Sequence, residues 1–252
     1  MKTLHIITIA LLTTAIAGCS DADEETPGQG AYTMTAYGEA FVEDKIPAEE
    51  TDGWQIEFST LEVTISELSA RNDDGESVEV DEVFTVDLTE DSGGEGHVLT
   101  TIEDAPAGRY DDLTYRIAPA NGQPAVHVEG TATKDSTTKT FSWTFETDEL
   151  YENCETNAML DDGGEATSEL TIHADHFFYD DLEGSEPNVA FDLIASADAN
   201  DDGEVTLEEL ADVDITGETR YQVGSRDISD LRGFVEAQTK TLGHIDGEGH
   251  CD

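Results

Sequence analysis

The chain has 252 residues, of which 59 are Asp or Glu and only 11 are Lys or Arg, so its formal net charge is −48. A chain this acidic cannot build a basic patch, so nucleic acid and anionic lipid headgroups are poor partners for it. Carboxylates are so frequent that two of them side by side carry no functional information, and any acidic site must be argued from spacing.

Residues 1–18 have the pattern of a signal peptide. Lys2 provides a short basic start, a mostly apolar run extends from Leu4 to Ala17, and the segment ends in Ile16-Ala17-Gly18-Cys19. The run is short for a membrane-spanning helix and ends in small residues typical of a cleavage site. It resembles a bacterial lipoprotein signal. The resemblance implies that Cys19 is acylated and that the mature chain is anchored to a membrane through this lipid.

The residue after the cysteine bears on location. The residue after Cys19 is Ser20 and not Asp. By resemblance to the sorting of Gram-negative lipoproteins, this implies the outer membrane. The lipid leaves open whether the protein faces the periplasm or the cell surface. Residues 19–31 are acidic and poor in apolar side chains, and we expect a disordered tether there.

Residues 32–174 alternate polar and apolar side chains with the period of two that is typical of β-strands. In "WQIEF", for example, Trp54, Ile56 and Phe58 alternate with polar neighbours. Nine segments have this character: YTMTAYGEAFV, WQIEF, LEVTI, VFTVDL, HVLTTI, LTYRIAP, AVHVEGTAT, TFSWTF and ELTIHA. Gly, Asp, Asn and Pro separate them, and no stretch keeps helical spacing. We predict a mainly β protein, a β-sandwich followed by a small α-helical C-terminal segment.

One turn adds a family resemblance. In "APAGRYDDLTYRIAP" a Pro-x-Gly-x-Tyr turn, Pro106 to Tyr110, leads into a strand. This resembles a recurrent pattern in bacterial lipoproteins with transthyretin-like or immunoglobulin-like sandwiches. It supports the sandwich and implies no particular activity.

Four histidines lie in two short segments. His173 and His176 are three residues apart with Asp175 between them, and on a helical turn both rings would lie on one side. His244 and His250 lie in a glycine-rich tail that can bend around an ion. Imidazole suits copper, zinc and nickel, so the four histidines are candidate ligands. Ordinary surface histidines are the alternative.

The stretch "DANDDGEVTLEE", residues 198–209, fits a twelve-residue calcium loop at every motif position. The expected side-chain and backbone ligands are Asp198, Asn200, Asp202, Glu204 through its carbonyl, Thr206 through water, and Glu209. Gly203 allows the sharp turn, and Val205 would pack into the core. Calcium takes six to eight hard oxygens, and the long Glu209 side chain can return with two of them. The pattern resembles the EF-hand family.

Acidity alone does not generate this pattern. The chain has five Asp-Gly pairs, and only Asp202-Gly203 has an Asp five residues before its glycine. No second loop of this kind is present in the sequence, whereas EF-hands usually work in pairs. We therefore expect a structural or weak extracellular calcium site, with a dissociation constant on the order of 10⁻⁴–10⁻³ M.

The segments around the loop predict helices. Residues 175–218 are expected to form an EF-hand-like helix-loop-helix whose first helix begins near Ser185 and Pro187. Thr206 and Glu209 read as a capping box for the second helix. Residues 219–252 are expected to form a C-terminal helix, with Asp227 as N-cap and Gly243 as its stop, followed by the His/Gly-rich tail.

Two cysteines remain once Cys19 carries lipid. Export places the protein in an oxidising compartment, so we expect Cys154 and Cys251 to form a disulfide that holds the tail. The competing interpretation makes Cys251 a metal thiolate beside His250.

The sequence contains no recognisable catalytic motif: no nucleophile elbow, phosphate-binding loop, dinucleotide fingerprint or zinc-protease helix is present. We expect a non-enzyme. Three functions remain: a membrane-anchored lipoprotein with a structural calcium site, a copper- or zinc-binding periplasmic protein, or a surface module that binds carbohydrate or protein. Phe177, Phe178 and Tyr179 would serve the third as a sugar-binding face, although such residues more often face the core.

Overall fold

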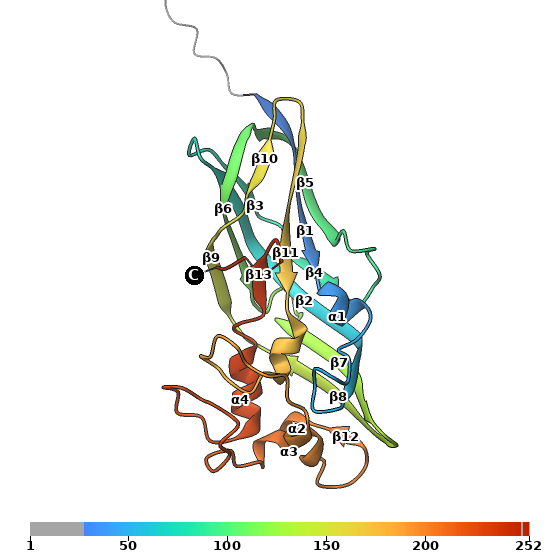
Figure 1. Ribbon diagram of the computed structural model, residues 1–252. Coiled ribbons are helices and arrows are strands. Elements are labelled where there is room, and N and C mark those ends of the chain that lie inside the picture. Colours follow the sequence, from blue (N-terminus) through green and yellow to red (C-terminus); the bar gives the residue numbers. More distant parts are fainter. Residues whose placement is uncertain (1–27, 248, 252) are drawn as a thin grey trace, which may run out of the picture.

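The structure is a computed structural model that describes residues 28–247 and 249–251 (Figure 1). The predicted signal peptide, the predicted acylation site Cys19 and most of the predicted tether lie outside the described residues. Within the described part of the chain, none of the helices has the length and hydropathy needed to cross a membrane.

Two β-sheets form the body, which confirms the predicted β-sandwich. The smaller sheet has the order β13-β11-β1-β5. Its strands are β1 (Gln29–Tyr37), β5 (His97–Pro106), β11 (Glu165–Ile172) and β13 (Gly243–Ile245). β1 pairs in parallel with β11 and antiparallel with β5. The first strand begins at Gln29, so the last residues of the predicted tether belong to the sheet instead.

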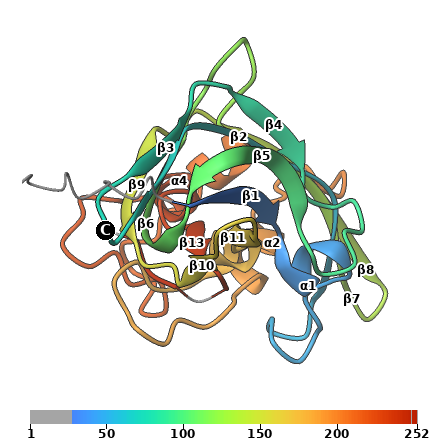
Figure 2. The ribbon, with the colours of Figure 1, turned by 90° about the horizontal axis from the view of Figure 1, so that it is seen from above.

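The larger sheet has the order β10-β6-β2-β7-β8-β12, and three further strands pair with β2 or β6. Its main strands are β2 (Gln55–Asn72), β6 (Gly108–Ile117), β7 (Val126–Lys134) and β8 (Thr137–Phe145). Its short strands are β3 (Ser77–Val80), β4 (Phe84–Asp87), β9 (Glu149–Cys154), β10 (Ala158–Leu160) and β12 (Glu204–Val205). Seen from above, these strands lie around β1, β11 and β13 (Figure 2).

One core fills the space between the sheets. The alternation in β8 buries Phe141, Trp143 and Phe145, and the neighbouring Phe178 adds to this aromatic group. Phe177 and Phe178 are each 1% exposed, so these two rings face the core and offer no sugar-binding surface. The same core continues to Ile245 in the tail.

Three of the predicted strands are wrong in extent. "WQIEF" and "LEVTI" form one continuous strand, β2, because a register shift against β7 between Phe58 and Thr60 absorbs the break in alternation. "YTMTAYGEAFV" ends as a strand at Tyr37, and its last residues form the short helix α1 (Glu39–Glu43). Sequence alternation does not reveal either event, since both are set by neighbouring strands.

The predicted start of the first loop helix is also wrong. α2 spans only Asp192–Ser196, and Val189 forms an extended bridge with Tyr179. The backbone N–H groups of Phe191 and Asp192 donate to Asp52 Oδ2 at 3.2 and 3.5 Å. A carboxylate from a distant loop therefore takes the place of the local cap expected at Ser185.

The C-terminal helix begins later than predicted. α4 spans Leu231–Gln238, and its N-cap is Asp230, whose Oδ1 accepts the Gly233 N–H at 2.9 Å. The predicted cap, Asp227, lies upstream of a segment held extended by the Ser229 carbonyl, which accepts the Ile215 N–H at 2.9 Å. The helix ends well before Gly243, which is the first residue of β13.

Candidate functional site

The predicted calcium loop lies at the end of the molecule that carries α2 and α3 (Leu207–Ala211) (Figure 1). β12, inside the loop, pairs in parallel with β8 through Glu204 opposite Thr140 and Val205 opposite Phe141. The Thr140 N–H also donates to the Gly203 carbonyl at 2.8 Å. Main-chain pairing thus holds the loop on the edge of the larger sheet.

The first half of the loop turns around Asp198. Its carboxylate accepts the N–H groups of Asp202 (3.2 Å) and Gly203 (2.9 Å), and Asn200 Oδ1 accepts the Asp202 N–H at 2.8 Å. Gly203 has φ +93°, a conformation that glycine adopts without strain. Asp202 Oδ1 in turn accepts the Glu204 N–H at 2.9 Å. The side chains of Asp198, Asn200 and Asp202 therefore all accept N–H groups of the loop's own backbone.

Glu209 closes the loop from its other end. Its Oε2 accepts from the N–H and the hydroxyl of Thr206, both at 3.0 Å, while the Thr206 hydroxyl accepts the Glu209 N–H at 3.2 Å. This is the capping box predicted from the sequence. Its Oε1 accepts the N–H of Ala199 at 3.2 Å, so the carboxylate spans the loop from position 12 to position 2.

One cation already contacts the loop. Lys139 Nζ, from β8, lies 2.5 Å from Asp198 Oδ2, and the Asp198 side chain is fully buried. The hydrogen bond from Lys139 holds the pKa of Asp198 below its usual range. The oxygen donor set fits calcium, whereas the ammonium group is an additional positive charge at the first ligand position. An ion at this site would have to share or displace that contact.

Four residues of the sandwich hold the loop segment in place. The Trp143 indole N–H donates to the Val205 carbonyl at 2.8 Å, and Val205 is fully buried as predicted. The Trp54 indole N–H and Lys134 Nζ both reach Asp192 Oδ1, at 2.8 and 2.7 Å. The hydrogen bond from Lys134, then that from Trp54, lowers the pKa of Asp192. Both tryptophans of the chain thus bind this segment, and so do Lys134 and Lys139.

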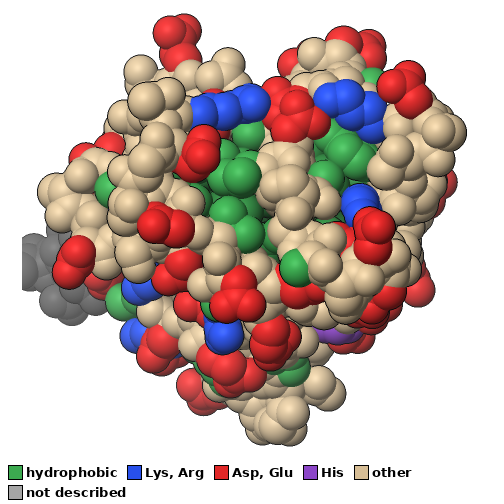
Figure 3. All heavy atoms as spheres, turned by 90° about the horizontal axis from the view of Figure 1, so that it is seen from below, with side chains coloured by type: hydrophobic (Ala, Val, Ile, Leu, Met, Phe, Trp, Pro, Cys, Tyr) green, Lys and Arg blue, Asp and Glu red, His purple; other side chains and the backbone are tan. Residues whose placement is uncertain are grey.

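The charge around the loop favours cations. Seen from below, the end of the molecule that carries α2 and α3 shows acidic side chains spread over its whole face, with separate patches of Lys and Arg between them (Figure 3). A surface of one sign raises the local concentration of counterions.

Three of the four predicted histidines come together. His173 follows β11, His176 lies in the 3₁₀ helix η1 (Ala174–Phe178), and His244 lies in β13. The ring centroids are 5.2 Å apart for His173 and His176, 4.3 Å for His173 and His244, and 5.4 Å for His176 and His244. His250 is exposed, and its ring centroid lies 6.0 Å from that of His244.

The tightest donor group within the cluster is His173, Asp175 and His176. Each offers one ligand atom, these atoms all lie within 4.8 Å of one another, and all three residues are buried. Burial, followed by the neighbouring His173 and His244 rings, lowers the pKa of His176 to about 3. His176 is therefore a neutral imidazole at neutral pH, the form that binds metal ions.

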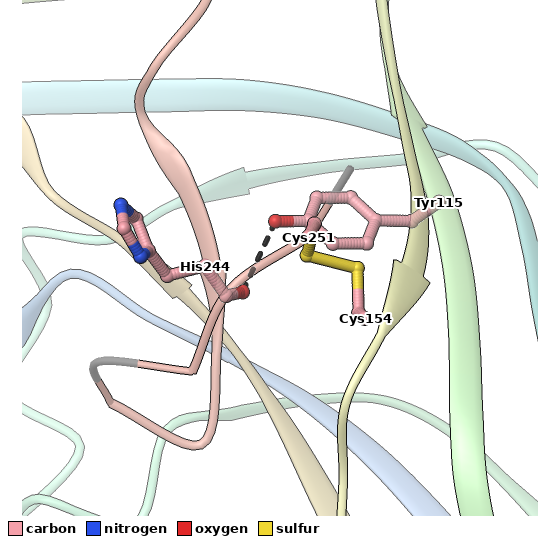
Figure 4. Close-up of a disulfide and its surroundings, with 4 residues drawn as sticks. All are labelled: Tyr115, Cys154, His244 and Cys251. Carbon is pink, nitrogen blue, oxygen red and sulfur yellow. Dashed lines mark hydrogen bonds between the residues drawn. A yellow bond between two sulfur atoms is a disulfide. The ribbon is translucent and has the colours of Figure 1, made fainter.

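The disulfide between Cys154 and Cys251 is present, as predicted (Figure 4). This excludes the competing interpretation of Cys251 as a metal thiolate. Nearby, the Tyr115 hydroxyl donates to the His244 carbonyl at 3.1 Å, and the His244 ring points away from the disulfide (Figure 4). The disulfide and the pairing of β13 with β11 together bring the C-terminal tail close to η1.

Comparisons with protein-family models, with curated proteins and with solved structures found no match to this chain.

Sequence reasoning missed the residues that reach the sites from far along the chain. Lys139, Trp54, Trp143 and Asp52 contact the calcium-loop segment, and Glu39 contacts the histidine group, with its Oε2 3.3 Å from His173 Nδ1. The spacing of residues in the sequence does not predict such contacts, because they depend on the topology of the sheets.

Proposed function

We propose that this chain is a calcium-binding lipoprotein whose single EF-hand-like loop serves to stabilise the fold. One observation carries the proposal: Glu209 closes the twelve-residue loop back onto Ala199, and β12 fixes that loop to β8. Asp198, Asn200, Asp202 and Glu209 supply side-chain oxygens, Glu204 a carbonyl, and Thr206 a hydroxyl for a bridging water. These are the hard donors that calcium prefers.

A structural role follows from what the loop connects. It joins α2 to α3, and its β12 strand is hydrogen-bonded to the sandwich edge. A divalent ion would neutralise Asp198, Asp202 and Glu209, which otherwise repel one another in a chain of net charge −48. An ion that binds only the folded chain adds its binding free energy to the free energy of unfolding. Calcium therefore stabilises the attachment of this segment to the sandwich.

Lys139 makes this a weak site. Its ammonium group competes for Asp198, so we expect a dissociation constant on the order of 10⁻⁴–10⁻³ M, the range of extracellular calcium modules. Such an affinity suits an exported protein exposed to millimolar calcium and does not suit a cytosolic sensor.

Replacing Lys139 with methionine should tighten calcium binding by about tenfold, because a positive charge next to the ion is removed while the aliphatic stem is kept. Calorimetric titration of calcium into Lys139→Met and the wild-type protein measures the difference. The matched control is Lys134→Met, which removes the ammonium group that pairs with Asp192 and leaves the contacts of Asp198 unchanged. Equal affinity in Lys139→Met and wild type would show that Lys139 does not compete with the ion.

The location remains that implied by the N-terminal sequence: acylation of Cys19 and attachment to the outer membrane. Residues 20–28 then link the lipid to β1. Mass spectrometry of the mature protein purified from the membrane fraction tests this, since Cys19→Ser should abolish the lipid mass and release the protein.

Calorimetric titration of calcium into the metal-stripped protein tests the function. We expect one saturable site that Glu209→Gln abolishes, since the amide keeps an oxygen for the Thr206 cap but cannot bind an ion with two oxygens. Glu208→Gln is the control. Glu208 is an exposed neighbour, so its substitution removes the same charge and leaves the loop oxygens in place. Diffuse heat without saturation, or equal binding in Glu209→Gln and Glu208→Gln, would refute the site.

A further inference from the structure

A second, chemically different donor group lies where β11 meets η1. We propose that His173, Asp175 and His176 bind one divalent transition-metal ion of the zinc class, with Glu39 completing the donor set. The group uses nitrogen ligands that calcium does not favour, and none of its residues belongs to the calcium loop.

His173 has one nitrogen fixed by the backbone. Its Nε2 lies 3.2 Å from the Gly247 carbonyl, which can only accept, so Nε2 carries the proton and donates. A neutral ring then has its lone pair on Nδ1, which faces Glu39 Oε2 at 3.3 Å. A cation between this lone pair and the carboxylate would be attracted by both.

The distance between those two atoms fits one metal ion held by both. Two ligands about 2.0–2.1 Å from one zinc ion at the tetrahedral angle are about 3.3–3.4 Å apart. The observed 3.3 Å matches the edge of a tetrahedral metal site.

His176 is oriented in the same manner. Its Nδ1 lies 3.0 Å from Thr241 Oγ1, and that hydroxyl donates its proton to the Gln238 carbonyl at 2.9 Å. Thr241 therefore accepts from Nδ1–H, which leaves the lone pair on Nε2. Metal-binding histidines characteristically donate their other N–H to a carbonyl, hydroxyl or carboxylate, and both histidines do so here.

The two carboxylates are also held in place. Asp175 is buried, and its Oδ2 accepts from the Tyr179 hydroxyl at 2.9 Å. Glu39 has φ +62°, a backbone conformation that is strained for a residue other than glycine, and it presents its side chain to His173. The Glu39 side chain is 26% exposed, which gives an ion a route from solvent.

Zinc titration of the full chain tests the proposal. The protein is stripped with chelator, saturated with calcium to fill the loop, and titrated with zinc chloride in a calorimeter. We expect one site in the wild type, weakened by about 100-fold or more in His176→Gln. His127→Gln, a strand histidine that hydrogen-bonds Thr144, is the matched control and should bind as the wild type does.

Thr241→Val supplies a second readout that does not remove a ligand. It keeps the shape of the side chain but loses the acceptor that orients His176, so zinc affinity should fall about 10- to 100-fold. Circular dichroism confirms that each variant is folded. Glu209→Gln should leave zinc binding unchanged, which separates this site from the calcium loop. Absence of saturable zinc binding in the wild type, or equal binding in His176→Gln and His127→Gln, would overturn the proposal.

Discussion

Replacing Trp143 with alanine is expected to lower the free energy of unfolding by about 3–5 kcal/mol, the largest single-residue effect that we predict. The indole is fully buried, and its ring packs on Phe141 with centroids 4.8 Å apart and on Phe178 at 6.2 Å. Alanine would leave a cavity at the centre of the aromatic group. Urea denaturation followed by circular dichroism measures the change.

Trp143→Phe separates packing from hydrogen bonding. Phenylalanine fills much of the cavity but cannot donate to the Val205 carbonyl. Because that carbonyl is left unpaired, we expect the free energy of unfolding to fall by about 1–3 kcal/mol. Because Val205 belongs to the calcium loop, Trp143→Phe should also weaken calcium binding. Wild-type stability together with wild-type calcium affinity in this variant would contradict the role given to Trp143.

Removal of the disulfide is the second large effect. The double substitution Cys154→Ala with Cys251→Ala should lower the free energy of unfolding by about 2–5 kcal/mol, because the bond closes a long loop across 97 residues. It also holds the tail, in which β13 pairs with β11 through only three residues. Amide hydrogen exchange of Gly243–Ile245 should therefore accelerate beyond the global change.

The wild-type protein treated with a thiol reductant serves as the control for that pair of substitutions. It should match the double variant both in unfolding midpoint and in exchange of the β13 amides. The Thr156–Asp246 contact of 2.7 Å would remain as a link between the tail and the segment after Cys154. A double variant as stable as the oxidised wild type would mean that such contacts alone hold the tail.

The sheets could be predicted because their residues carry a local signal. Trp54, Ile56 and Phe58 alternate in sequence, and all three are buried, Trp54 just before β2 and the other two within it. Short strands were missed where that signal is absent: β13 is only Gly243–Ile245, and β12 is only Glu204–Val205. Both form because a longer strand offers an unpaired edge, which no local pattern records.

The two sites differ in how much the sequence predicted. Ligand spacing within residues 198–209 is local, so the loop and its Thr206–Glu209 cap were predictable. Lys139 comes from another strand and was not. For the second site, the spacing of His173 and His176 indicated a shared helical turn, and the disulfide indicated that His244 would approach. Glu39 lies far upstream, and only the positions of α1 and β11 bring it to His173.

The calcium dependence of the unfolding free energy tests the central claim most directly. For wild type and Glu209→Gln, urea unfolding is measured over a series of free calcium concentrations at constant ionic strength. If one ion binds only the folded chain, wild-type stability should rise by about 1.4 kcal/mol per tenfold increase in calcium above the dissociation constant. Glu209→Gln should stay flat across the calcium series, because the amide keeps an oxygen for the Thr206 cap but cannot bind the ion with two oxygens and loses the acceptor for the Ala199 N–H. A flat wild-type curve, or parallel curves for the two proteins, would contradict a calcium ion that holds this loop on the sandwich.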